Sequence, residues 1–167
     1  MTRYAKMLTV ICLLTPGMGL TDPGNDVPLP MWQKGSGGYY LHGVFDGDIE
    51  SDMLIDTGSS YVVLTPETLA KLKKSGASEY IRTTRGATAA GRVIEVKVFS
   101  VSTLKLGEQC VLHNIEVIAL PGADRDILGL SALRRLQPFA MQLEPAVLTV
   151  SACSSPGTAI LATAIRP

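Results

Sequence analysis

The run Asp56-Thr57-Gly58-Ser59 constrains this chain more than any other part of its sequence. An apolar segment, residues 53–55, leads into the run, and a second apolar segment, residues 61–64, follows it. This pattern predicts a carboxylate on a tight turn at the end of a buried strand. The run occurs once in 167 residues, a length that suits one domain with a substantial core. A site that needs two such carboxylates therefore requires a second subunit.

Composition and charge favour a β-rich globular domain. Apolar residues make up 46% of the chain and aromatic residues only 5%, and the apolar residues occur in short runs. Lys+Arg and Asp+Glu both total 15, so no net charge would attract nucleic acid or a membrane surface. The two histidines, His42 and His113, lie far apart without the spacing of metal ligands. We therefore expect no metal and no cofactor.

The N-terminal segment, residues 1–19, is typical of an export signal. It combines a basic start, a short apolar run and small residues at a cleavage position, namely Arg3 with Lys6, residues 7–14, and Gly17 with Gly19. We expect cleavage near Gly19 and a periplasmic location; an uncleaved membrane anchor and a cytosolic N-terminus are the alternatives. Two cysteines, Cys110 and Cys153, remain after cleavage. They permit one disulfide, and two buried thiols are the alternative.

The sequence divides the rest of the chain into three parts. Residues 20–38 are rich in Pro, Gly and Asp, so we expect a flexible linker in which Trp32 is the one large aromatic residue able to dock on the domain. The folded domain is expected over residues 39–153. Residues 154–167 form a C-terminal tail, largely apolar from 159 to 165, that either pairs at a subunit interface or is disordered.

Strand and turn signals alternate along the domain. Residues 39–45 and 49–55 predict a hairpin with its turn at Asp46-Gly47. After the apolar segment 61–64, Thr65 and Pro66 are suited to cap and open a short helix. Further expected features are two long β segments over residues 83–106, a bulge near 98–101, strands at 111–120 and 141–150, and a helix over 131–136 capped by Ser131.

The chemistry of the motif follows from its residue types. Peptide hydrolysis by carboxylates needs two of them sharing one proton, and Asp56 would supply one. The Thr57 hydroxyl would link the two loops of the pair, and Gly58 would let backbone approach the carboxylate without a Cβ. The Ser59 hydroxyl would donate to the outer carboxylate oxygen. Taken alone, Asp-Thr-Gly is a short pattern that also fits a polar turn after a strand.

In its setting, the motif resembles that of the retroviral-type (retropepsin-like) aspartic proteases, in particular single-domain bacterial members with an N-terminal export segment. The resemblance covers roughly residues 39–150 and rests on residues 54–59 and on Ile127-Leu128-Gly129-Leu130, with Leu133 in the helix behind. It implies a mainly β, closed acid-protease-like half-barrel that acts as a homodimer. It also implies that Asp56, Thr57 and Gly58 form the catalytic loop and that Ile127, Leu128 and Gly129 pack beneath it.

The family carries a β-hairpin flap between its two motifs. The matching stretch here is residues 83–94, with Thr88, Ala89, Ala90 and Gly91 near its tip. This stretch contains no aromatic residue of the kind that pepsin-like enzymes use. Ser59 follows Gly58 as in two-domain pepsin-like enzymes, whereas many retroviral enzymes have Ala there.

The resemblance implies an aspartic endopeptidase that acts on polypeptides as a homodimer, with membrane association possible through an uncleaved N-terminal segment. An alternative from another class is a protease-like fold without turnover, which would bind peptides or serve as a scaffold. Phosphoryl transfer is disfavoured, because the chain has neither a glycine-rich phosphate loop with its lysine nor a second acidic metal-binding cluster.

Overall fold

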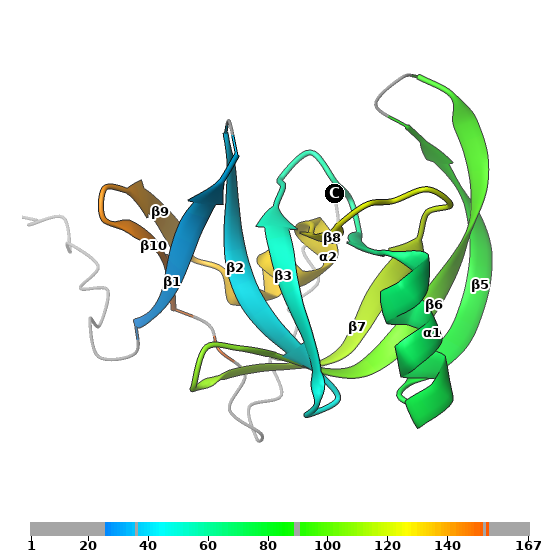
Figure 1. Cartoon of the computed structure of the whole chain (residues 1–167), viewed down its shortest axis with the longest axis horizontal. Coiled ribbons are helices and arrows are strands. Elements are labelled where there is room, and N and C mark those ends of the chain that lie inside the picture. Colours follow the sequence, from blue (N-terminus) through cyan, green and yellow to red (C-terminus); the bar gives the residue numbers. More distant parts are fainter. Residues whose placement is uncertain (1–25, 36, 89–90, 152, 154–167) are drawn as a thin grey trace, which may run out of the picture.

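The computed structural model describes residues 26–35, 37–88, 91–151 and 153 (Figure 1). The expected export segment, residues 1–19, and the C-terminal tail, residues 154–167, lie outside this part. The strands are β1 (Val27–Lys34), β2 (Gly38–Phe45), β3 (Ile49–Ile55), β4 (Val62–Leu64), β5 (Ser78–Ala87), β6 (Val93–Leu106), β7 (Cys110–Ala119), β8 (Asp126–Leu128), β9 (Phe139–Leu143) and β10 (Ala146–Val150). The helices are α1 (Pro66–Ser75), α2 (Leu130–Leu133) and the 3-10 turn η2 (Arg134–Leu136).

The strands form one mainly antiparallel sheet that closes on itself. Its order is β5-β6-β7-β4-β8-β3-β2-β1-β10-β9, and β6 pairs with β2 as well as with β5 and β7. This second pairing, from Gly43 opposite Leu106 to Phe45 opposite Leu104, joins the central strands into a barrel. The predicted mainly β, barrel-like fold is therefore confirmed. The β5–β6 hairpin and the β9–β10 hairpin lie at opposite ends of the molecule (Figure 1).

The turn between β2 and β3 is the one that the sequence predicts. Asp46 and Gly47 both adopt positive φ, at 50° and 85°, and the Asp48 N–H donates to the Phe45 carbonyl at 3.3 Å. Such a left-handed pair matches the twist of an antiparallel hairpin. It sets β3 in the register that ends at Ile55, directly before the Asp-Thr-Gly run.

Helix α1 also follows its sequence signals. The Thr65 hydroxyl accepts from the Thr68 N–H at 3.2 Å, and Pro66 occupies the first turn. The helix ends at Gly76, which adopts φ 79° and donates its N–H to the last carbonyls. Leu69 and Leu72 are buried against the sheet. In the described part of the chain no helix is long and apolar enough to cross a membrane.

The expectation of a flexible linker over residues 20–38 is wrong for the second half of this range, because residues 27–34 form β1. Prolines usually argue against strand structure, and Pro28 and Pro30 lie in this strand. However, β1 pairs with β10 only over residues 27–30 and with β2 only over residues 31–34. The prolines therefore occur where the strand has one described neighbour, and each can leave its missing N–H on the open side.

The helix expected over residues 131–136 differs in its cap. It begins at Leu130 after Gly129, and its last turn is the 3-10 turn η2. The Ser131 hydroxyl does not cap it. That hydroxyl accepts from the Val62 N–H and donates to the Glu116 carbonyl, both at 2.8 Å, so Ser131 joins α2 to β4 and β7.

The bulge expected near residues 98–101 of β6 lies instead on the partner strand β5, opposite Val98 and Phe99. Val98 and Phe99 are both buried, so the alternation of β6 breaks there as predicted. Opposite them the register shifts between Tyr80 and Arg82 on β5, which leaves Ile81 as the extra residue. A bulge of this kind increases the local twist of the hairpin.

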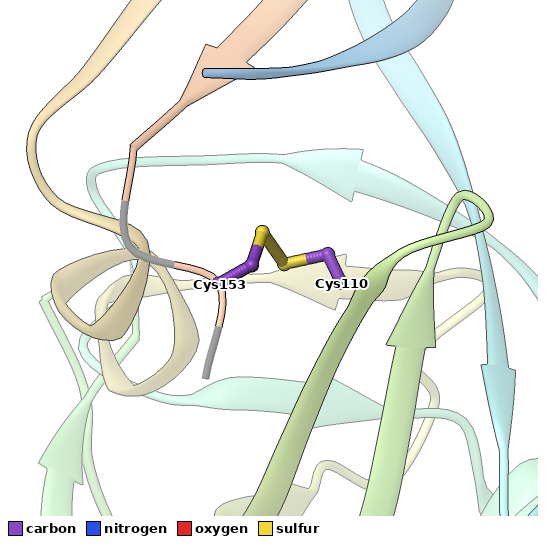
Figure 2. Close-up of a disulfide and its surroundings, with 2 residues drawn as sticks. All are labelled: Cys110 and Cys153. Carbon is purple, nitrogen blue, oxygen red and sulfur yellow. A yellow bond between two sulfur atoms is a disulfide. The ribbon is translucent and has the colours of Figure 1, made fainter. Parts of the chain in front are cut away.

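A disulfide between Cys110 and Cys153 resolves the open question about the two cysteines (Figure 2). Cys110 is the first residue of β7, and Cys153 follows β10; their Cα atoms are 4.9 Å apart. The bond anchors the end of the described fold to the barrel.

The buried side chains form two clusters. The larger one fills the barrel and includes Phe45, Met53, Leu112 and Leu133, none of which is exposed. The smaller one lies beside the β5–β6 hairpin; its buried members are Val63, Val96, Val98 and Ile118. The second cluster supports the cleft described below, whereas the first holds the barrel together.

Candidate active site

The Asp-Thr-Gly loop lies beside the second run on which the resemblance rests, Ile127-Leu128-Gly129. Strand β3 pairs in parallel with β8, which places Leu54 opposite Ile127 and Ile55 opposite Leu128. At the end of this pairing the Asp56 N–H donates to the Leu128 carbonyl at 3.2 Å. The sequence separates these runs by about seventy residues, and the strand pairing brings them together.

The Asp56 carboxylate is held by the backbone of its own loop. The Gly58 N–H donates to Asp56 Oδ1 at 2.8 Å, and the Ser59 N–H donates to the Asp56 carbonyl at 3.3 Å. A Cβ on Gly58 would lie only 3.1 Å from Oδ1. Glycine at this position therefore allows the close backbone approach that orients the carboxylate.

Gly129 packs directly beneath the loop. A Cβ at this position would lie 2.0 Å from the Tyr61 carbonyl oxygen and 2.8 Å from the Ser59 carbonyl oxygen, which no real side chain tolerates. The next N–H, from Leu130, donates to the same Ser59 carbonyl at 2.8 Å. Only glycine lets β8 support the loop at this distance.

Thr57 and Ser59 differ in what they contact. Thr57 is exposed, so its hydroxyl is accessible to a second subunit. The Ser59 hydroxyl donates to the Tyr61 carbonyl at 2.8 Å, not to the outer oxygen of Asp56 as the sequence suggested. Its role in this structure is to close the turn that follows the motif.

The stretch expected to form a flap is the upper part of the β5–β6 hairpin. The Thr88 N–H donates to the Arg92 carbonyl at 2.9 Å, the Gly91 N–H donates to the Thr88 carbonyl at 2.8 Å, and Gly91 has φ 75°. Ala89 and Ala90, the other expected tip residues, lie outside the described residues. The hairpin extends above the level of the Asp-Thr-Gly loop in Figure 1.

A cleft of about 300 Å³ lies between the loop and the hairpin. One wall is formed by residues 58–61 and the other by residues 84–88. Aliphatic side chains from the smaller buried cluster and its surroundings line the remainder, namely Val63, Ile94, Val96, Ile118 and Leu120. We call this cleft the aliphatic compartment. Its position next to Asp56 makes it a candidate site for a substrate side chain.

Comparison with known proteins identifies the family. A family model described as aspartyl protease matches residues 41–132, which is more than half of the chain and contains both the Asp-Thr-Gly-Ser run and Gly129. This chain belongs to the aspartyl protease family. A search of curated proteins finds no match.

Solved structures show that the fold is retropepsin-like. The crystal structure of a retropepsin-like aspartic protease from Rickettsia conorii is similar to this chain with a TM-score of 0.54 and 20% identity, over 75% of this chain and 89% of the other. The retroviral protease-like domain of Ddi1 from Leishmania major gives a TM-score of 0.44 at 19% identity, over 66% of this chain and 86% of that domain. The aspartyl protease family model, together with the fold shared with the Rickettsia conorii structure, confirms the predicted retropepsin-like family.

A charged clamp connects the base of the hairpin to the barrel, and the sequence did not reveal it. Arg82 on β5 donates to both carboxylate oxygens of Glu116 on β7, at 2.7 and 2.8 Å, and to the Tyr61 hydroxyl at 3.2 Å. The hydrogen bonds from Arg82 lower the pKa of Glu116. Tyr61 follows the motif by two residues, so the clamp holds the hairpin base against the protease loop.

A buried carboxylate, Asp126, is the second feature that sequence reasoning missed. It is 5% exposed and accepts from the Ser51 hydroxyl at 2.6 Å, the Thr65 N–H at 2.6 Å and the Thr68 hydroxyl at 2.8 Å. These donors come from β3 and the start of α1. The available signal was an acidic residue directly before the apolar run at Ile127, which is unusual at the entrance to a buried strand.

Proposed function

We propose that this protein is an aspartic endopeptidase that acts as a homodimer, with Asp56 of each subunit contributing one carboxylate to a shared site. The observation that carries the proposal is a carboxylate held by a loop that also forms one wall of a cleft. Asp56 accepts from the Gly58 N–H, its loop rests on Gly129, and the cleft between that loop and the β5–β6 hairpin has room for a substrate side chain.

The chemistry needs one proton on the pair of carboxylates. The ionised Asp56 takes a proton from a water molecule as the water oxygen attacks the peptide carbonyl carbon, and the protonated partner donates its proton to the carbonyl oxygen. The resulting tetrahedral intermediate collapses when a proton passes to the amide nitrogen and the C–N bond breaks. We expect activity in the acidic to mildly acidic range, because coupled carboxylates lose the shared proton as pH rises.

The homodimer follows from the count of catalytic residues. Asp-Thr-Gly occurs once in the chain, and Thr57 is exposed beside it. In the proposed dimer the two Thr57 hydroxyls form hydrogen bonds across the pair of loops. The β5–β6 hairpin of each subunit closes over an extended peptide and holds it by backbone hydrogen bonds.

We also propose that the protein is exported to the periplasm, either free or anchored to the membrane by an uncleaved N-terminal segment. The sequence of residues 1–19 supports this location, and so does the disulfide between Cys110 and Cys153, since disulfides persist mainly in oxidising compartments. Fractionation of cells that express the full chain tests the proposal. Recovery of the mature N-terminus near residue 20 in the periplasm agrees with it, and a reduced, uncleaved cytosolic protein does not.

The direct test is a cleavage assay with a proteome-derived peptide mixture. Wild-type protein is expected to generate new peptide termini at acidic pH, and folded Asp56→Asn protein is expected to generate none. Specific activity is further expected to fall when the protein is diluted below the dimer dissociation constant. Sedimentation measures the fraction of dimer at each concentration. Intact peptides that bind without being cleaved would instead favour the peptide-binding alternative. Equal cleavage by Asp56→Asn would end the aspartic protease proposal.

A further inference from the structure

A second hollow adjoins the aliphatic compartment and has a different chemical character. It has a volume of about 520 Å³ and shares Ser60 and Tyr61 with the aliphatic compartment, so the two hollows have a common wall directly after the Asp-Thr-Gly-Ser run. Its other walls come from β7, α2 and η2. We call it the arginine compartment; its polar lining includes Ser60, Tyr61, Asn114, Glu116, Arg134 and Arg135.

The acidic group of this compartment is already neutralised. Both oxygens of Glu116 accept from Arg82, at 2.7 and 2.8 Å, so this carboxylate is occupied by a cation from outside the hollow. Arg135 is also engaged, because its Nη1 donates to the backbone carbonyls of His113 and Asn114. The ion pair with Arg82 offsets the negative charge of Glu116. The positive charges of Arg134 and Arg135 are not offset by a carboxylate of this compartment.

Arg134 is the group that remains available. It is exposed, lines the compartment, and makes no ion pair or side-chain hydrogen bond within the described residues. Ser60 and Asn114 are exposed there too, and neither side chain has a hydrogen-bond partner in the same part of the chain. The compartment thus offers a guanidinium, a hydroxyl and an amide as donors, with no free carboxylate to compete.

We propose that the arginine compartment binds the carboxylate of an acidic substrate residue, while the aliphatic compartment holds a nearby apolar side chain of the same peptide. This inference rests on the proposed function and adds a substrate class to it. An extended peptide advances about 3.3 Å per residue and turns successive side chains to opposite faces, so residues close in sequence reach adjoining hollows. The guanidinium of Arg134 matches a carboxylate because it presents paired N–H donors in one plane.

The test uses direct binding, so that it does not depend on turnover. Asp56→Asn protein is titrated with extended peptides that carry one isoleucine anchor and one glutamate, moved position by position along the peptide. Each peptide has a glutamine counterpart, and all have amidated C-termini. A further set replaces the glutamate by a free C-terminal carboxylate, which separates a side-chain site from a site for the peptide end.

Two charge reversals are compared in the Asp56→Asn background. Arg134→Glu places a negative charge in the arginine compartment. Lys74→Glu is the matched control, because Lys74 is exposed on α1, lines neither compartment, and its reversal changes net charge by the same amount. Sedimentation establishes a protein concentration at which all three proteins have the same oligomeric state, and binding is measured there.

At one position relative to the anchor, glutamate is expected to bind about fivefold more tightly than glutamine, as for one partly exposed ion pair. This ratio is expected to fall as salt is raised. Arg134→Glu should abolish or invert the ratio, and Lys74→Glu should retain it. The same ratio is expected in kcat/KM for the active proteins.

Two results would overturn the inference. One is equal binding of the glutamate and glutamine peptides at every position; the other is a glutamate preference that survives in Arg134→Glu. If Arg134→Glu changes the oligomeric state and leaves the binding ratio intact, the compartment belongs to a subunit interface and the inference is also wrong. Selective binding without any cleavage by wild-type protein would refute the proposed function alone.

Discussion

At the scale of single residues, the close approach of Gly129 to the Asp-Thr-Gly loop makes the clearest prediction. Gly129→Ala is expected to destabilise the protein by about 3 kcal/mol or more, because the new methyl group would overlap the Tyr61 carbonyl and displace the loop. Urea unfolding measures the change. Gly86→Ala is the matched control, since its Cβ would meet only Val96 Cγ2 at 3.9 Å. Equal stability of the two variants would show that the loop does not rest on Gly129.

The Ser59 hydroxyl gives a second prediction at this scale. Because it donates to the Tyr61 carbonyl and not to Asp56, Ser59→Ala should cost about 1 kcal/mol of stability and should leave the pH dependence of kcat/KM unchanged. Thermal unfolding and a pH–rate profile measure the two effects. A shift of the acidic limb of that profile would mean that Ser59 contacts the carboxylate in the active dimer.

At the scale of elements, the clamp between Arg82 and Glu116 decides how firmly the hairpin base is held. Hydrogen bonds from Arg82 lower the pKa of Glu116, so the folded state keeps this carboxylate charged at a pH where the unfolded chain has begun to protonate it. The clamp therefore contributes its full stabilisation at pH values above the ordinary pKa of a glutamate. This stabilisation is lost as pH falls through the lowered pKa of Glu116. The clamp thus persists in the mildly acidic range expected for activity.

Glu116→Gln tests the clamp. The variant should unfold more easily than wild type at neutral pH by less than about 1 kcal/mol, because the pair is partly exposed, and this difference should shrink as pH falls. Denaturant unfolding at several pH values measures it. Glu79→Gln, an exposed change on β5, the strand that carries Arg82, is the control. If the difference in unfolding free energy between Glu116→Gln and wild type stays constant through the acidic range, the lowered pKa of Glu116 does not contribute to stability.

The elements also show where sequence reasoning succeeds. Local signals predicted the Asp46-Gly47 hairpin, the Thr65 cap of α1 and the turn at Asp56, because each depends on residues adjacent in the chain. Strand β1 was missed because its prolines look like linker residues until its change of partner, from β10 to β2, is known. Ser131 was misassigned because its hydroxyl contacts β4 and β7 instead of its own helix.

The residues that shape the site were harder to predict, because their partners are remote in sequence. Arg82 and Glu116 are 34 residues apart, and Ser51 and Asp126 are 75 apart. The side chains of Arg82, Glu116 and Ser51 are ordinary for a strand, and only Asp126 has a local signal, its position directly before a buried apolar run. The pairing of β6 with β5 and β7 brings Arg82 near Glu116, and the pairing of β3 with β8 brings Ser51 near Asp126.

At the scale of the whole molecule, the disulfide is expected to be a major source of stability. Cys110 and Cys153 are 43 residues apart, and closing a loop of that length should stabilise the fold by about 4 kcal/mol in the chain-entropy description. Urea unfolding with and without reductant measures this difference. The Cys110→Ala/Cys153→Ala variant is the control and should not respond to reductant. An unchanged midpoint for reduced wild-type protein would show that the bond does not constrain the unfolded chain.

The single Asp56 per chain has a consequence for inheritance. A chain with Asp56→Asn keeps Gly129 as the support of its loop and leaves Thr57 exposed, so it should still pair with wild-type chains. If equal amounts mix at random, about a quarter of the dimers contain two aspartates. When the variant replaces half of the wild-type chains, total activity should therefore fall to about a quarter and not to about a half. An inactivating allele of this gene is expected to be dominant, whereas in an enzyme that carries both aspartates on one chain it would be recessive.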